Sequence, residues 1–283
     1  MITLCPFKLV HRHPVLYFND TVSNPIVLFN DVQTLEPVIL SPNNSSILSL
    51  DNFFTFSYGH WLEAFLPLLM LPKTVGYVIT EVELPPSTIQ RFHIKQWCDI
   101  LSLPRYLPTE RTKASISHSL CMSLVHPDWI ELLRSFIPMA LEAYPQPPNQ
   151  KILIQRCQLG SGWNTSRNLE NRHEFLTRFS SSNFSVMYME DLPVLQQVAI
   201  FASASVIIGV HGSALSNLMF CNPSCKVIEI RSPLFWNSTY AGIGSYLNLN
   251  YSLILGSEHH GNTGLYSHCV HADLDIIEKA LSL

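Results

Sequence analysis

The second half of the chain alternates short apolar runs with segments of helical spacing, and this alternation limits the fold more than any other feature. The apolar runs are typical of strands and cover residues 151–156, 185–190, 205–210 and 226–230. Segments of helical period separate them, at 171–179, 192–204 and 213–221. Strands of this kind, separated by helices, predict a parallel sheet covered on both faces. In such a sheet ligands bind beyond the carboxyl ends of the strands.

The first half also reads as α/β, and a proline-rich stretch separates the two halves. Residues 144–150 (YPQPPNQ) hold three prolines, which cannot continue a helix and favour an extended path. The sequence therefore predicts an α/β chain of two Rossmann-like lobes, residues 1–147 and 148–271, facing a central cleft. Residues 272–283 form an amphipathic helix that could pack on either lobe.

Composition and charge exclude several classes of protein. The chain of 283 residues is 47% hydrophobic and 13% charged, which is typical of a globular protein. Its formal net charge of −4 and its lack of a dense basic run argue against a nucleic-acid partner. No apolar run reaches the roughly 18 residues of a membrane span, and residues 1–14 lack the order of a signal peptide. A cytoplasmic protein without a transmembrane segment is therefore the expectation.

The turn after the strand at 205–210 carries the most suggestive chemistry. It reads His211-Gly212-Ser213 and leads into a predicted helix. Glycine lets the backbone approach a ligand closely, and Ser213 is able to cap the helix. The free N–H groups and positive dipole of a helix start then form an anion site, to which His211 adds a hydrogen bond or a charge. A capped helix with an incidental histidine is the simpler alternative.

Two arginines and one carboxylate favour a nucleotide diphosphate as the anion. Arg156 ends one strand and Arg167 lies in the loop after it, where guanidinium groups suit bidentate contact with phosphates. Glu229 stands in an apolar strand, and a buried carboxylate needs a partner. Vicinal ribose hydroxyls are one candidate partner, and Arg231 is the other.

The run GVHGSALSNLMFCNPSCKVIEI resembles the signature of glycosyltransferase family 61. The matching residues are His211, Gly212, Leu215, Ser216, Asn217, Phe220, Pro223 and Glu229. Upstream, Arg156, Arg167 and Asn171 fit the family's two arginines and asparagine, and Tyr58-Gly59-His60-Trp61 resembles its N-terminal helix start. The chain departs from the pattern at Ala214, where glycine is usual, and at Ala64, where an acidic residue is frequent.

The resemblance implies a GT-B architecture and an inverting transfer from a nucleotide sugar, often UDP-linked, to a glycan or glycoprotein acceptor. No metal and no other cofactor is implied. Xylose is favoured as the donor sugar over N-acetylglucosamine and arabinose. His60 or Glu63, the acid nearest to Ala64, is the implied catalytic base. The implied donor contacts are Arg156, Arg167, Asn171, His211, Gly212, Ser213, Ala214, Asn217 and Glu229.

The sequence also bears on two other functions, of which one stays open and one is excluded. Because an acid is missing at Ala64, a non-catalytic nucleotide- or glycan-binding module of the same fold stays open. An α/β-hydrolase built on Ser213 is excluded, because its nucleophile elbow would read G-x-S-x-G. Asp273 and Asp275 have the spacing of an Asp-x-Asp metal motif, but they lie in the final helix rather than after a strand.

Overall fold

The computed structural model describes residues 127–282, with gaps at 157–168, 181, 234–237 and 258–269, and shorter segments before residue 127. Those segments are 2–3, 15–16, 28–29, 39–40, 46–49, 58–66, 79–84, 91–102 and 106–108. The chain divides into two compact units, Met1–Leu132 and Leu133–Leu283.

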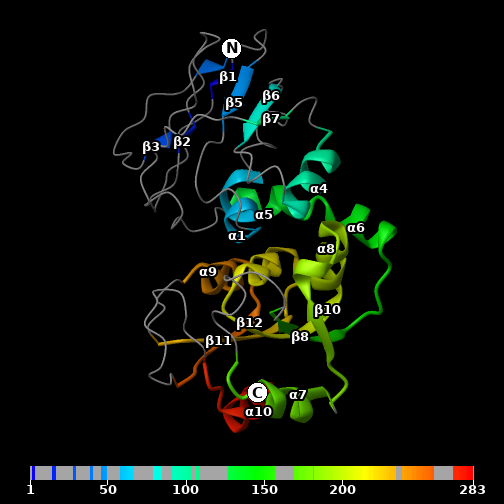
Figure 1. Cartoon of the computed structure of the whole chain (residues 1–283), viewed down its shortest axis with the longest axis vertical. Coiled ribbons are helices and arrows are strands. Elements are labelled where there is room, and N and C mark those ends of the chain that lie inside the picture. Colours follow the sequence, from blue (N-terminus) through cyan, green and yellow to red (C-terminus); the bar gives the residue numbers. More distant parts are fainter. Residues whose placement is uncertain are drawn as a thin grey trace. The chain divides into compact units, whose positions relative to one another are not determined.

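The second unit is built on a five-stranded parallel sheet (Figure 1). Its strands are β8 (Gln150–Gln155), β9 (Ser185–Tyr188), β10 (Ala204–Val210), β11 (Lys226–Arg231) and β12 (Asn250–Leu255). Their spatial order is β12-β11-β10-β8-β9. Counted along the chain from β8 this is the doubly wound order 2-1-3-4-5, in which the winding reverses between β8 and β10. Sheets of this order bind ligands at that reversal.

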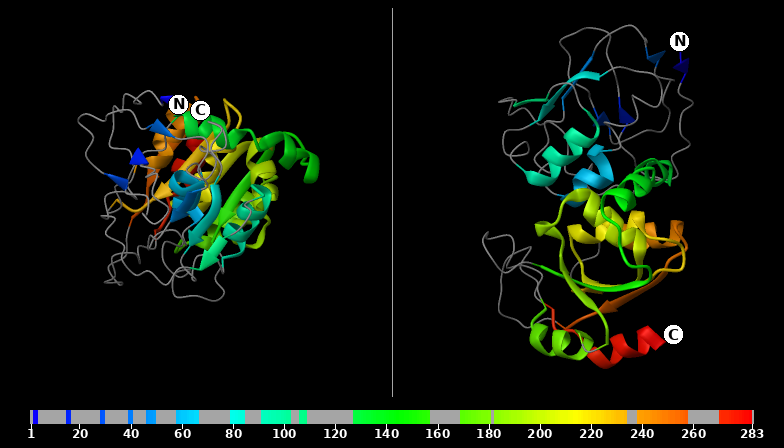
Figure 2. Two further views of the ribbon diagram at one scale, coloured as in Figure 1. Left: turned by 90° about the horizontal axis from the view of Figure 1, so that it is seen from above. Right: turned by 90° about the vertical axis from the view of Figure 1, so that its right-hand side faces the viewer.

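Helices cover both faces of this sheet (Figures 1 and 2). One face carries α7 (Arg172–Ser180) and α10 (Leu274–Ser282), and the other carries α8 (Val194–Ser203), η5 (Ser213–Phe220) and α9 (Thr239–Tyr246). The short 3₁₀ turn η4 (Met189–Asp191) follows β9, and α6 (Ile137–Ala143) packs beside α8. The helix α5 (Pro127–Arg134) precedes α6.

The alternation of side chains along β11 shows how the sheet divides its two faces. Ile228 and Ile230 are fully buried in the core under α7 and α10, together with Phe175, Phe179 and Ile277. Because successive strand residues point to opposite faces, Glu229 turns toward the face of η5 and α9. A carboxylate thus lies in the apolar layer on that side, at 1% exposure.

The first unit contains a three-stranded parallel sheet of β5 (Ser46–Ser49), β6 (Ile79–Leu84) and β7 (Tyr106–Pro108). Two antiparallel pairs of two-residue strands accompany it. These are β1 (Ile2–Thr3) with β4 (Ile39–Leu40), and β2 (Val15–Leu16) with β3 (Leu28–Phe29). The helices are α1 (Tyr58–His60), its π-helical continuation η2 (Trp61–Phe65) and α4 (Phe92–Ile100).

The predicted α/β class and the parallel sheet of the second half are confirmed. The helical spacing of residues 128–144 also predicts one continuous helix, which is wrong, because the chain forms α5 and α6 with a break at residues 135–136, just before Pro138. Proline has no N–H to bond the preceding turn, which explains the interruption. Although α6 precedes the expected boundary at residue 147, it belongs to the second unit.

The C-terminal helix α10 packs on the second unit, which resolves the alternative that the sequence left open. Ile277 is fully buried in the core of that unit, and the Lys226 ammonium donates to the carbonyl oxygens of Ala280 and Leu281. A cation at the last carbonyls of a helix compensates both the open acceptors and the dipole. None of the helices in the described ranges is long and apolar enough to cross a membrane.

Candidate functional site

The reversal point of the sheet brings together Arg156 and the His211-Gly212 turn. Gly209 of β10 pairs with Ile154 of β8, so the residues after both strands leave the sheet side by side. A Cβ atom built on Gly212 would lie 2.8 Å from the Nη1 atom of Arg156. The backbone of Gly212 is extended, with φ 173°, so its conformation does not demand glycine, and the Arg156 guanidinium occupies the space that a Cβ would fill. The guanidinium group therefore lies directly against the turn.

His211 is held in place by three interactions with two elements, β11 and α9. Its main-chain N–H donates to the Ile230 carbonyl oxygen at 2.8 Å, which continues the sheet by one bond. Its ring Nδ1 lies 2.5 Å from the Oε1 atom of Glu229, and both side chains are buried. Its ring also stacks at a tilt on Tyr240 of α9, with 4.8 Å between centroids. The imidazole consequently has one orientation.

Glu229 has partners for both carboxylate oxygens. His211 engages Oε1, and the Tyr251 hydroxyl donates to Oε2. When the carboxylate is ionised it only accepts, so the hydrogen that it shares with His211 then lies on Nδ1. Burial, and then the charge of Glu229, raise the pKa of Tyr251 far above its usual value, so the phenol stays protonated. Glu229 thus pairs with His211 and Tyr251 instead of Arg231, the protein partner that the sequence suggested.

The helix start after the turn differs from the expectation in two ways. The segment 213–221 was expected to be an α-helix capped by Ser213. Instead η5 is a 3₁₀-helix with Gly212 at its cap position and no side-chain cap. The carbonyl oxygen of Gly212 accepts the Leu215 N–H and the Tyr240 hydroxyl, each at 2.8 Å. Ser213 and Ala214 are both partly exposed at the first turn, where a ligand could reach their backbone.

Asn217, an expected donor contact, is fully buried and joins η5 to α8. Its amide donates to the Gln197 side-chain oxygen at 3.0 Å and to the Ala214 carbonyl oxygen at 3.1 Å. Gln197 in turn donates to the carbonyl oxygens of Met189 and Leu192. These hydrogen-bonded amides connect the first turn of η5 with α8 and with the segment before it.

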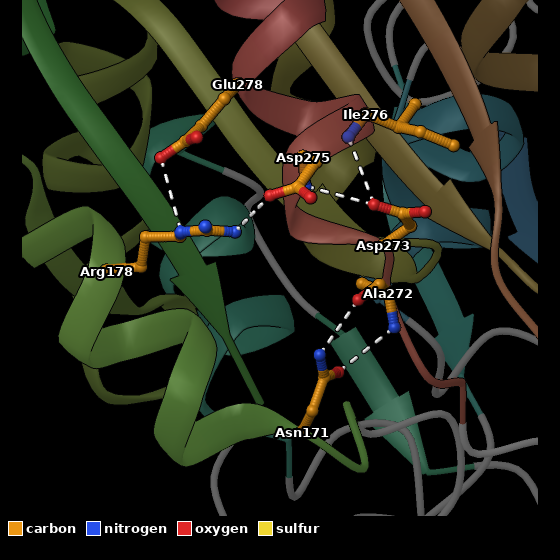
Figure 3. Close-up of polar contacts among 7 residues, drawn as sticks. All are labelled: Asn171, Arg178, Ala272, Asp273, Asp275, Ile276 and Glu278. Atoms are coloured by element: carbon orange, nitrogen blue, oxygen red, sulfur yellow. Dashed lines mark hydrogen bonds and ion pairs between the residues drawn. The ribbon is translucent and has the colours of Figure 1, made fainter.

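Asn171, also an expected donor contact, binds main chain at the other face of the sheet (Figure 3). Its amide nitrogen donates to the Ala272 carbonyl oxygen at 2.8 Å, and its oxygen accepts the Ala272 N–H at 3.0 Å. The structure therefore ties the start of α7 to the segment before α10. Arg167, the second arginine of the sequence motif, lies outside the described residues.

The two carboxylates of the Asp-x-Asp spacing, Asp273 and Asp275, both make contacts within the protein at the start of α10 (Figure 3). Asp273 accepts the N–H groups of Asp275 and Ile276 at the start of α10, which is a helix N-cap. Asp275 pairs with Arg178 of α7 at 2.8 Å. Across the described ranges, no group of three or more His, Cys, Asp and Glu residues is placed to hold a metal ion.

We expect Asn171→Ala to lower the free energy of unfolding by about 1–2 kcal/mol, because it removes two partly buried hydrogen bonds. Chemical denaturation measures this loss. Asn250→Ala is the matched control, since Asn250 is exposed at the start of β12 and should change stability by less than about 0.5 kcal/mol. Equal stability of the two variants would contradict the structural role.

The candidate bases His60 and Glu63 lie in the first unit, on α1 and η2. The π-helical winding of η2 carries Glu63, which is 9% exposed, and His60 is half-buried. Departures of this kind from α-helical winding are frequent at functional sites.

Tyr58 contacts the ring of His93 edge-on, with 5.1 Å between the ring centroids. Burial, with a smaller effect from Arg91, lowers the pKa of His93 to about 4, so this second imidazole is neutral near pH 7.

Sequence reasoning missed Tyr240 and Tyr251, because the helix α9 and the strand β12 were not predicted. The apolar run at 250–255 is a strand signal that would have placed Tyr251 beside Glu229. No sequence pattern indicates that the hydroxyl of Tyr240 reaches the carbonyl oxygen of Gly212.

Comparison with known proteins gives a match to a protein family. The family model described as Glycosyltransferase 61 matches residues 58–228, which is more than half of the chain. The matched range begins at Tyr58 and includes His60, Glu63, Arg156 and the whole His211-Gly212 turn. A search of curated proteins found no similar sequence.

Proposed function

Because the chain belongs to glycosyltransferase family 61, we propose that it moves a sugar from a UDP-sugar to a glycan or glycoprotein acceptor, with inversion at the anomeric carbon. The observation that carries this proposal is the contact of Arg156 with the His211-Gly212 turn at the reversal point of the sheet. That contact joins a cation, an imidazole and a helix start at the place where doubly wound sheets bind ligands.

The donor diphosphate fits this set of groups. The guanidinium of Arg156 offers paired N–H donors to phosphate oxygens, and Gly212 leaves no Cβ to keep them apart. Ser213 and Ala214, which are partly exposed, add backbone N–H groups at the start of η5. Arg167 is proposed as a second cation on the diphosphate. In this proposal Asn171 and Asn217 support the donor site indirectly, because each of them holds a main-chain segment in place.

Stabilisation of the leaving diphosphate is assigned to protein charges, without a metal or another cofactor. Glu229 beside Nδ1 favours the protonated imidazole of His211, because a buried carboxylate stabilises a neighbouring cation. Arg156 and imidazolium together offset the negative charge that develops as the bond to the sugar breaks. Glu229 is thereby proposed to support His211 and not to bind the ribose.

The acceptor hydroxyl loses its proton to a base from the first unit in this proposal. His60 and Glu63 are the two candidates, and single displacement requires one of them on the acceptor side. A GT-B arrangement follows, with residues 1–147 as the acceptor lobe and 148–271 as the donor lobe. Xylose remains the favoured sugar, ahead of N-acetylglucosamine and arabinose.

Incubation of the protein with a panel of UDP-sugars tests the function. We expect slow release of UDP from one of them in the absence of acceptor, detected by chromatography, and faster release when a glycan acceptor is added. GDP- and ADP-linked sugars are the controls for the nucleotide. Tight binding of UDP without hydrolysis or transfer would instead identify a non-catalytic nucleotide-binding module.

A further inference from the structure

Tyr251 lies on the edge strand of the five-stranded sheet and joins the group around His211 through Glu229. We infer that Tyr251 is a positioning residue of the donor site, which acts through Glu229 on the proton held by His211. This inference rests on the proposed function for its role, but its test needs no substrate.

The fold seats Tyr251 closely beside Glu229. The tyrosine lies on β12, which pairs with β11 in parallel register, and its hydroxyl donates to Oε2 of Glu229. Its side chain packs against Gly244 of α9, where an added Cβ would lie 3.2 Å from the Cβ and ring atoms of Tyr251. A larger residue at 244 would push the ring, so the small residue of α9 and the phenol of β12 fit one another.

The charged and titratable groups around this pair come from four elements. Glu229 and Arg231 lie on β11, Tyr251 on β12 and Tyr240 on α9, and the charges of Glu229 and Arg231 act on Tyr251. Arg156 follows β8 and lies against Gly212, the neighbour of His211. Within this group, Glu229 contacts both His211 and Tyr251 and so connects the two.

Removal of the Tyr251 hydroxyl should change the apparent pKa of the His211–Glu229 pair in a defined direction. Its hydrogen bond stabilises the form of the His211–Glu229 pair that carries a net negative charge, because hydrogen bonding to a carboxylate favours ionisation. Without that bond the pair holds its proton more tightly, whichever of the two side chains carries it. The apparent pKa of the pair therefore rises.

Nitrogen NMR of ¹⁵N-histidine-labelled protein, titrated without ligand, measures this effect. The resonance of His211 is assigned by its absence in His211→Gln. We expect Tyr251→Phe to raise the apparent pKa of the pair by about half a unit or more, given the usual strength of a hydrogen bond to a charged group. Tyr240→Phe keeps the ring on His211 and removes the hydroxyl that donates to Gly212, and its pair should titrate within about 0.2 units of the wild type.

A second variant keeps the inference testable should Tyr251→Phe not fold. 3-Fluorotyrosine placed at position 251 has a more acidic hydroxyl, donates more strongly and should lower the apparent pKa of the pair. Titration of His211 that is unchanged in both variants would overturn the inference. Failure of the wild-type protein to bind UDP would instead overturn the proposed function, and would leave the titration result standing.

The pH dependence of UDP binding should show the same shift. If the protonated pair binds the diphosphate, the pH midpoint of UDP affinity will move upward in Tyr251→Phe by the amount found in the NMR titration. A purely structural role would lower affinity equally at every pH and leave that midpoint in place.

Discussion

Sugar transfer will fall by about 10²- to 10⁴-fold when the catalytic base is replaced by an amide, because loss of general base catalysis has an effect of that size. Glu63→Gln and His60→Gln are the two variants to compare. Each keeps the size of the side chain approximately and removes its capacity to take a proton. The rate is measured with the donor sugar that the UDP-sugar panel identifies, at saturating acceptor.

The two variants separate the candidates because only one should lose this much activity. Glu63 is buried on the π-helical turn η2. His60, at the end of the preceding helix α1, is more exposed. UDP affinity should stay within about twofold in both variants, since the donor contacts are assigned to the second unit. Retention of more than a tenth of the rate by both would remove the pair from the mechanism.

Arg156→Ala will weaken UDP binding by about 10- to 100-fold, as expected for loss of one charged, paired hydrogen-bonding group. The reason is the position of its Nη1 atom against Gly212, beside the first turn of η5. Calorimetry with UDP measures the affinity, and UMP shows how much of the loss depends on the second phosphate.

Two matched substitutions define what Arg156 contributes. Arg156→Lys keeps the charge but not the planar fork, so we expect an affinity between those of the alanine variant and the wild type. Arg178→Ala removes a guanidinium from the same unit, where Arg178 pairs with Asp275 and Glu278 of α10. It should bind UDP like the wild type. Equal affinities for Arg156→Ala and Arg178→Ala would exclude Arg156 from the donor site.

Much of the second unit was predictable because its signals are local. Each of the strands β8, β10 and β11 is a short apolar run, and the helices α7 and α8 have a clear helical period. The order of elements then implies a parallel sheet, whose strands end at one edge. Arg156 and His211 could therefore be expected on the same rim from their places in the sequence.

The sequence did not predict the contacts that depend on partners distant in sequence. Asn171 and Asn217 are polar residues beside a predicted site, and their spacing gives no sign that Ala272 and Gln197 are their partners. Ser213 was expected to cap a helix, but the close approach of Gly212 to Arg156 and the bond from Tyr240 give η5 a different start. Propensity is a weak prior where such tertiary contacts compete with it.

The sequence by itself determined the α/β class, the family and the rim on which Arg156 and the His211-Gly212 turn lie, because periodicity and motif spacing are local properties. Only the tertiary structure decided the partners of Glu229, since His211 and Tyr251 reach it from the end of β10 and from β12 across the sheet. A buried carboxylate must be paired, but its own neighbours in sequence do not say with what. The structure thus places Glu229 beside His211 and Tyr251, and support of the imidazole is its proposed role in place of a ribose contact.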